Sequence, residues 1–329
     1  MRIVLPHPAR TRVSALASLS IALAGAACAS HATRPAAGTA RPAPAHPAGA
    51  RLATAPEQFL TVGDVRLRYR EIGRGAPVVL LHGYGASLEL WHGVADSLAV
   101  GYRVIVLGQR GHGQSSKFAD PARFGREMGA DVVRLLDHLG APRAHLVGHS
   151  MGGVIAAYVA AHHPDRVATA SLVAPPAYAD SATAARVMTP VVAGLERGGG
   201  FRAFFQQFAP GMPDSVAGAF SAEIMAANDP GSLIGVARAF GGFQSGQAGA
   251  AMARVPALVA VGTDDAVLVT NARDLAAWWP QARSVEIAGA DHVSVLRRPE
   301  LLAAVRAQLR VRNAAGAARP RAAPSAHGR

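Results

Sequence analysis

Short apolar runs, many of them ending in glycine, aspartate or histidine, recur along the chain. They predict strands at Gln58 to Val62, Val65 to Arg70, Pro77 to Leu81, Tyr102 to Leu107, Ala144 to Val147, Ala170 to Val173, Ala257 to Val261 and Ser284 to Ile287. The first two runs are separated by Gly63-Asp64, a hairpin signal in reversed order. The third run is continuously apolar, as expected of a central strand that is covered on both faces.

Helical periodicity alternates with these runs. Apolar residues at Val132, Leu135 and Leu136 form a stripe within Met128 to Leu139, and the small and apolar residues of Val154 to Ala161 suit a buried helix. Strands that alternate with helices predict an α/β fold with a mostly parallel, doubly wound sheet. Sites in such sheets form at the carboxyl ends of the strands.

Residues 177–253 show helical signals only, and we call this stretch the helical insertion. Asp180-Ser181, Asp214 and Asp229-Pro230 are typical helix starts, and Gly198-Gly199-Gly200 breaks the first helix. An all-helical segment between strands of a sheet is expected to form a cap over the site. Within it, Phe204, Phe205 and Phe208, together with Phe201, line one helical face. This face predicts packing of the cap on the body, an apolar wall for the substrate, or both.

The positive charge is concentrated at the two ends of the chain. Residues 1–56 contain six arginines and no acid, and residues 310–329 contain five arginines and no acid, which accounts for nearly all of the formal net charge of +12. The body is therefore close to neutral, and we expect no nucleic-acid groove in it. The 50% hydrophobic content of the whole chain is sufficient for a large core, and the sequence has no run of 18 strictly apolar residues.

The first 29 residues are typical of an export signal: basic residues, then the apolar stretch Val13 to Ala27, then small residues that offer cleavage sites. The single cysteine, Cys28, lies at the end of this segment, in a sequence that loosely resembles a lipoprotein box. Lipid attachment at Cys28 and simple cleavage both fit. We therefore expect a periplasmic, secreted or envelope-anchored protein, with membrane contact only through such a lipid. Residues 30–56 are expected to be a Pro/Ala-rich linker and residues 312–329 a disordered tail, on either side of a domain at 57–311.

Candidate chemistry centres on Gly148-His149-Ser150-Met151-Gly152, which lies between a strand and a helix. A serine at such a corner is exposed to a base and to a substrate, although the motif alone is also compatible with a glycine-rich turn. A serine nucleophile requires a base. We favour His292, which follows the last strand, because His162 and His163 belong to the next helix and His327 to the tail.

A carboxylate must orient that base. Asp265 and Asp264 both follow a strand, and since neighbours at a strand end point in different directions, only one should reach the imidazole. Asp291 adjoins His292 in sequence and is poorly placed to orient it. Backbone N–H groups of Met151 and of Tyr84, in the turn after Leu81, could hold an oxyanion, although His82-Gly83 is also compatible with a plain strand-ending turn. No metal and no organic cofactor is required.

These motifs resemble those of the α/β-hydrolase family over about 250 residues. The resemblance rests on His82-Gly83, Arg110-Gly-His-Gly-x-Ser115, the elbow at Ser150, Gly262-x-x-Asp265, Gly289-x-x-His292 and Arg298-Pro-Glu300, in the family's order of serine, acid and histidine. It implies an eight-stranded sheet that is antiparallel at its second strand, a helical lid, and Asp265 rather than Asp264 as the acid. Gly108 departs from the family, which often has a structural aspartate there.

The expected function is a serine hydrolase that cleaves a small-molecule carboxylic ester or lactone. Relatives with an aspartate nucleophile, such as epoxide hydrolases and haloalkane dehalogenases, are disfavoured by Ser150, and the motifs look most like those of small-substrate esterases and enol-lactone hydrolases. A carbon–carbon bond hydrolase or a cofactor-free perhydrolase would use the same triad. A ligand-binding module without turnover is the remaining alternative. The sequence does not indicate an oligomeric state.

Overall fold

The computed structural model describes residues 51–209, 211–244 and 246–311. The predicted export signal, Cys28, most of the predicted linker and the predicted tail lie outside these ranges. Within them, no helix combines the length and the apolar character needed to cross a membrane.

The described chain forms one eight-stranded sheet in the order β1-β2-β4-β3-β5-β6-β7-β8. The strands are β1 (Gln58–Val62), β2 (Val65–Ile72), β3 (Ala76–Leu81), β4 (Tyr102–Leu107), β5 (Ala144–His149), β6 (Val167–Val173), β7 (Ala257–Gly262) and β8 (Ala282–Ile287). Strand β2 runs antiparallel to both β1 and β4, and the remaining pairs are parallel. The predicted fold class is confirmed, including the antiparallel second strand.

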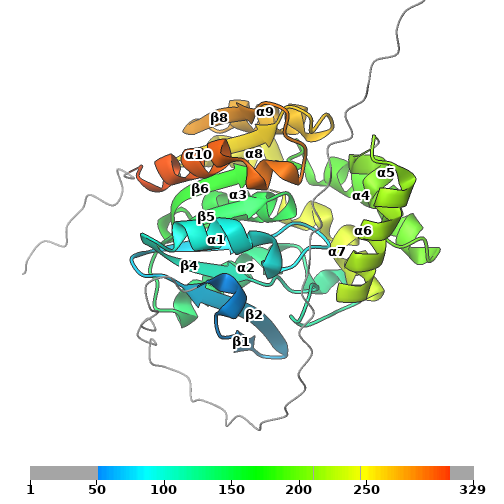
Figure 1. Cartoon of the computed structure of the whole chain (residues 1–329), viewed down its shortest axis with the longest axis horizontal. Helices are drawn as coiled ribbons and strands as arrows, with labels where there is room; N and C mark the ends of the chain where they lie inside the picture. The colour runs from blue at the N-terminus through cyan, green and yellow to red at the C-terminus, as the bar shows by residue number, and fades with distance from the viewer. Residues whose placement is uncertain (1–50, 210, 245, 312–329) are drawn as a thin grey trace, which may run out of the picture. The chain divides into compact units, whose positions relative to one another are not determined.

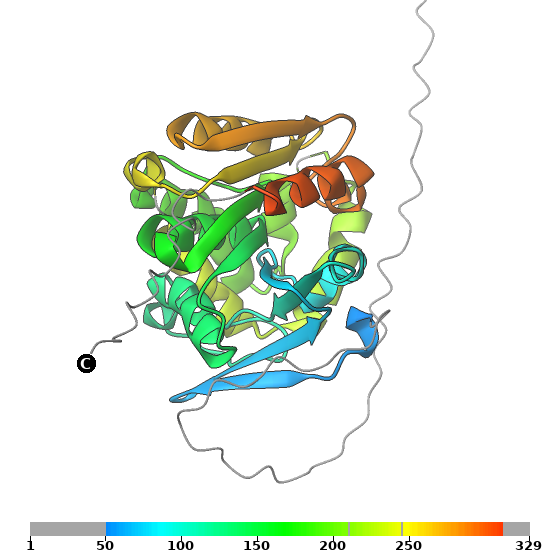
Figure 2. The ribbon, with the colours of Figure 1, turned by 90° about the vertical axis from the view of Figure 1, so that its left-hand side faces the viewer.

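Helices cover both faces of the sheet, as Figures 1 and 2 show. Apolar side chains of α1 and α10 pack on one face, and those of α2, α3 and α9 pack on the other. Their bounds are α1 (His92–Leu98), α2 (Arg126–His138), α3 (Met151–His162), α9 (Leu268–Trp278) and α10 (Pro299–Leu309). Helix α3 contacts β5 and β6 on one side and α2 on the other. It is apolar all round for this reason, because a helix that is packed on several sides has little surface left for water.

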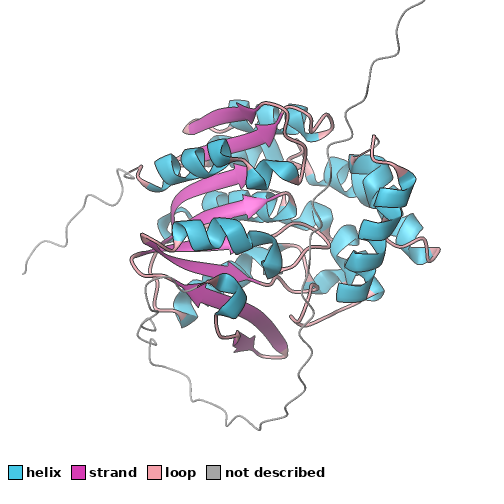
Figure 3. Ribbon diagram, in the orientation of Figure 1, coloured by secondary structure: helices cyan, strands magenta, loops and turns pink. Residues whose placement is uncertain are grey.

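The chain between β6 and β7 contains helices and no strand within the described residues (Figure 3). These helices are α4 (Ser181–Glu196), α5 (Arg202–Phe208), α6 (Asp214–Ala227), α7 (Pro230–Arg238) and α8 (Gly246–Met252). Two of the predicted starts have the expected caps: Asp180 accepts from the amide of Thr183, and Asp229 accepts from that of Ser232, both at 2.7 Å. In Figure 1, α4 to α7 gather beyond one end of the strands.

The folded body begins earlier than the sequence predicted. Leu52 is fully buried, its amide donates to Asp96 Oδ1 at 2.7 Å, and its carbonyl accepts from Arg70 at 3.0 Å. The expected end of the linker at residue 56 is therefore wrong, because one apolar side chain and two hydrogen bonds anchor residue 52. The Ala- and Pro-rich composition around this residue concealed that anchor.

Gly108, the departure from the family pattern, lies in a crowded place. The Ser115 hydroxyl donates to the Gly108 carbonyl at 2.6 Å and accepts from the amide of Arg68 at 3.0 Å. A Cβ at position 108 would lie 3.1 Å from the Arg68 carbonyl oxygen and 3.3 Å from the Ser115 hydroxyl. Ser115 thus ties β2 to the turn after β4 without the help of a side chain at position 108.

Candidate active site

The candidate nucleophile lies on a strained turn. Ser150 joins β5 to α3 with φ 53° and ψ −122°, a region that residues with a Cβ rarely adopt. Its amide donates to the carbonyl of Val173 at 2.8 Å, which ties the turn to β6. A Cβ on Gly148 would collide with the Gly152 carbonyl, and one on Gly152 would collide with the carbonyls of Leu81 and His82. The strain is therefore held by backbone packing on three sides.

The structure brings His292 and Asp265 together. His292 Nδ1 lies 2.7 Å from Asp265 Oδ2, and the Asp265 side chain is almost fully buried. Since the carboxylate accepts, Nδ1 carries the proton and Nε2 is left as an acceptor. Asp264 is exposed and its Oδ1 accepts from the Thr263 hydroxyl, so the two neighbouring aspartates point apart as expected.

His149, which the sequence reading did not single out, supports the loop of His292. Its Nε2 lies 2.7 Å from the main-chain oxygen of His292, and the two rings are 4.7 Å apart. Its Nδ1 lies against Gly83, where a Cβ would come within 3.2 Å of it. The position of His149 inside the serine motif was the available signal. The His149 side chain therefore contacts both the loop that carries His292 and the turn after β3.

The residues of the two predicted oxyanion donors, Tyr84 and Met151, line the same cavity as Ser150. Met151 is the first residue of α3, so its amide has no partner within the helix, and the amide of Tyr84 has no hydrogen-bond partner in the part of the chain that the structure describes. The side chain of Tyr84 is anchored, because its hydroxyl donates to the carbonyl of Leu233 in α7 at 2.8 Å. Both amides thus remain available to a developing negative charge.

Three buried histidines near Tyr84 and Ser150 are held in the neutral form. Burial lowers the pKa of His82 to about 4. Burial and the neighbouring imidazole of His82 lower the pKa of His112 to about 3, and burial and the neighbouring His292 lower that of His149 to about 3. His82 acts as a connector, since its Nε2 accepts from the amide of Gln109 at 3.0 Å. These histidines bind main-chain groups, whereas His292 has a carboxylate partner.

A narrow cavity lies against Ser150 and His292. Its walls are mostly apolar: Tyr84, Met151, Pro176, Met188, Phe204, Phe208, Phe240 and Leu268. The space between them admits little more than one water molecule. Met188, Phe240 and Leu268 were not predicted, because nothing in an apolar residue of a helix signals which cavity it faces.

Phe205 does not line this cavity, contrary to expectation. Its ring packs 6.1 Å from that of Phe220 and 5.8 Å from that of Phe201. Phe204 and Phe208 are four residues apart and share a face of α5, whereas the next residue after Phe204 is rotated by about 100°. The predicted stripe therefore divides into a wall of the cavity and a packing contact within the insertion.

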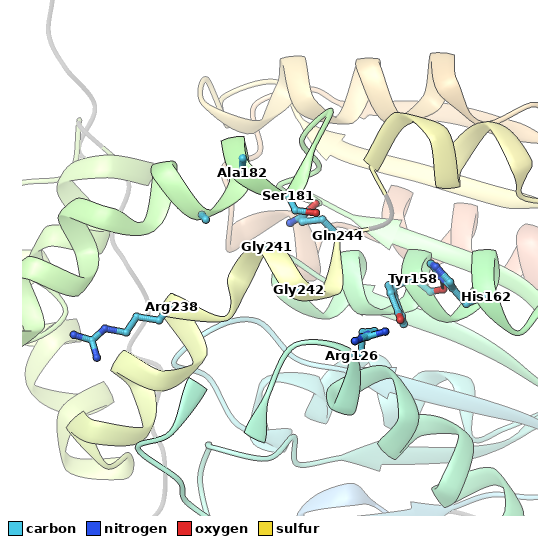
Figure 4. Close-up of a pocket in the computed structure, with 10 residues that line it drawn as sticks. Arg126, Tyr158, His162, Ser181, Ala182, Arg238, Gly241, Gly242 and Gln244 are labelled. Carbon is cyan, nitrogen blue, oxygen red and sulfur yellow. Dashed lines mark hydrogen bonds between the residues drawn. The ribbon is translucent and has the colours of Figure 1, made fainter. Parts of the chain in front are cut away.

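A wider hollow lies elsewhere on the described surface. It has a volume of about 650 Å³ and lies between α3, the start of α2 and the insertion, where it is lined by Tyr158, His162, Arg126 and Gln244 among others (Figure 4). The Arg238 side chain points away from Tyr158 and His162 in this view. Ser150, Asp265 and His292 are absent from its walls, so this wider hollow is separate from the candidate triad.

The chain has the α/β-hydrolase fold. The family described as alpha/beta hydrolase fold matches residues 76–196. The chain is 42% identical over 139 residues to the dihydrolipoyllysine-residue acetyltransferase component of the acetoin cleaving system of Cupriavidus necator, a match that covers 42% of this chain and 37% of the relative. It spans 37%, 32% and 42% of the length of the first three curated relatives that it matches.

Solved structures of this fold match most of the chain. The enol-lactonase of Burkholderia xenovorans superimposes with a TM-score of 0.60 and 26% identity, covering 77% of this chain and 99% of that one. An esterase of Thermogutta terrifontis superimposes with a TM-score of 0.64 and 27% identity, covering 78% and 98%.

Proposed function

We propose that this protein is a serine hydrolase that cleaves a carboxylic ester or lactone through an acyl-enzyme on Ser150. The observation that carries the proposal is the 2.7 Å contact between His292 and the buried Asp265, at a cavity that Ser150 also lines. The likeness to an enol-lactonase and an esterase over most of their length supports the same class of bond.

In the first half of the reaction, Ser150 Oγ attacks the carbonyl carbon while His292 Nε2 takes the hydroxyl proton. Asp265 holds the imidazole in the required tautomer and stabilises its charged form. The amides of Tyr84 and Met151 donate to the oxyanion of the tetrahedral intermediate. When this intermediate collapses, the bond to the alcohol oxygen breaks and His292 returns the proton to that oxygen.

In the second half, a water molecule replaces the alcohol. His292 takes its proton as the water oxygen attacks the acyl carbon, and the same amides stabilise the second oxyanion. The bond to Ser150 then breaks, the carboxylic acid leaves, and the proton returns to Ser150 Oγ.

Labelling with a fluorophosphonate, followed by mass spectrometry of the peptides, tests the nucleophile directly. We expect one adduct on Ser150 of the wild type and none in Ser150→Ala. His292→Ala should label far more slowly, and both variants should lose at least about 10³-fold in kcat with an aryl ester. Ester hydrolysis that persists in Ser150→Ala would refute the proposal.

A further inference from the structure

The cavity against Ser150 has no charge complement for an anionic substrate. Apart from His292, which is bound to Asp265, its described lining contains no side chain that is charged at neutral pH. Tyr84 contributes the one phenol, whose hydroxyl is engaged with the Leu233 carbonyl, and burial raises the pKa of that hydroxyl well above its usual range. A carboxylate placed here would lose its hydration without gaining a cation.

The walls also limit the size of the occupant. The rings of Phe204 and Phe208 lie 4.7 Å apart, and the rings of Phe204 and Phe201 are equally close. Phe201, Phe208 and Met188 are buried, so this side of the cavity is a packed aromatic and thioether surface. Such a surface favours a small apolar group, which gains contacts and leaves no polar atom unpaired.

We propose that this cavity selects esters whose buried half is small, apolar and uncharged, and discriminates against esters that carry a carboxylate there. The inference rests on the proposed function, because it assumes that Ser150 attacks the ester carbonyl beside this cavity.

Two matched pairs of esters test it, one with the charge on the acyl side and one with the charge on the alcohol side. On the acyl side, p-nitrophenyl pentanoate is compared with mono-p-nitrophenyl glutarate, in which a carboxylate replaces the terminal methyl group. On the alcohol side, 4-methylphenyl acetate is compared with 4-acetoxybenzoate, whose leaving group is the better one. We expect the anionic member of at least one pair to have a kcat/KM lower by about 100-fold or more. Differences below about tenfold in both pairs would overturn the inference.

A cation placed in the wall should reverse the discrimination. Phe204 is half-buried and lines the cavity, whereas Phe205 is half-buried on the same helix and does not. Phe204→Arg should narrow the gap within the discriminating pair by about tenfold or more, through faster turnover of the anionic ester. Phe205→Arg should leave the ratio unchanged. Equal ratios in these two variants would contradict the assignment of the wall.

The two levels of the proposal fail in different ways. Turnover of the neutral esters by Ser150→Ala would remove the proposed function, whatever the charge preference. Normal labelling of Ser150, together with equal turnover of neutral and anionic esters, would leave the hydrolase intact and remove only the charge selection.

Discussion

The two sides of the cavity above Ser150 are built in different ways. The sheet side supplies polar groups from turns at strand ends, and main-chain packing holds those turns, as at Gly148 and Gly152. The insertion side supplies apolar side chains such as Met188 and Phe208, and it is joined to the body by hydrogen bonds between side chains and main chain, from Asn228 to Gly85 and from Tyr84 to Leu233. In the proposed hydrolase, backbone geometry therefore positions the catalytic groups, and side-chain packing shapes the cavity for the substrate. The predictions below test this division, beginning with the largest effect.

The largest effect is expected at the buried acid. Asp265→Asn leaves the shape of the site intact but allows the imidazole of His292 to adopt the wrong tautomer, so kcat should fall by about 10³- to 10⁴-fold. Asp264→Asn, one residue away and exposed, should change kcat less than about twofold. Steady-state kinetics with an aryl ester measure both, and equal losses in the two variants would show that Asp265 has no special role.

The next effect concerns the backbone packing of the elbow. In Gly152→Ala the new methyl group would overlap the carbonyls of Leu81 and His82, so we expect a loss of about 3–4 kcal/mol in the free energy of unfolding. Gly93→Ala is the control, because Gly93 is helical, exposed and has no neighbour within 4 Å of an added Cβ. Urea unfolding should show that the control is as stable as the wild type or slightly more stable. A stable Gly152→Ala protein would mean that the turn is not tightly held.

Acid should weaken the body first, because the insertion contains no histidine. Burial, and then the charge of Arg143, lower the pKa of His145 in β5 to about 4. Below about pH 6.5, His145 binds a proton in the unfolded chain but stays neutral in the folded chain. The free energy of unfolding is therefore unaffected by this group above pH 6.5 and falls as the pH drops towards 4. His145→Gln should flatten this fall by on the order of 1–3 kcal/mol in urea titrations at several pH values. An unchanged slope would mean that His145 is not held neutral.

A smaller effect should follow from the contact that joins the two sides. The Asn228 amide donates to the Gly85 carbonyl and its oxygen accepts from the amide of Gly113, both at 3.0 Å, so the insertion steadies the turn that carries Tyr84. Asn228→Ala should cost about 1–2 kcal/mol of stability and lower kcat about five- to tenfold, with little change in KM. Asn271→Ala removes a 2.8 Å bond to Ala177 that does not touch this turn, and should spare kcat. A change in KM alone would argue against a positioning role for Asn228.

The smallest effect distinguishes the two neighbouring rings of α5. Phe204→Leu enlarges the cavity and should shift the preferred acyl length towards longer esters by about three- to tenfold in relative kcat/KM. Phe205→Leu should leave the acyl-length profile as it is. An identical shift in both variants would show that the profile responds to the looseness of the helix rather than to the wall.

The sequence predicted the parts of the molecule that depend on local backbone chemistry. All eight strands appear where apolar runs predicted them, because strand periodicity and turn residues are local properties. The family resemblance indicated Asp265 rather than Asp264, and Asp265 is the one that contacts His292. The parts it missed depend on contacts between distant segments. Asn228 bonds to residues more than 100 positions away, and Phe240 faces the cavity from a short 3₁₀ helix that carries no motif. Leu52 was hidden by the composition of its neighbours.

The helical insertion leaves the sheet after β6 and returns at β7, and these two strands are adjacent and parallel. Their register therefore does not depend on what connects them. During evolution the connecting segment can be exchanged, lengthened or shortened while the strand-end turns stay in place. Related proteins can therefore acquire new substrates and keep the same reaction.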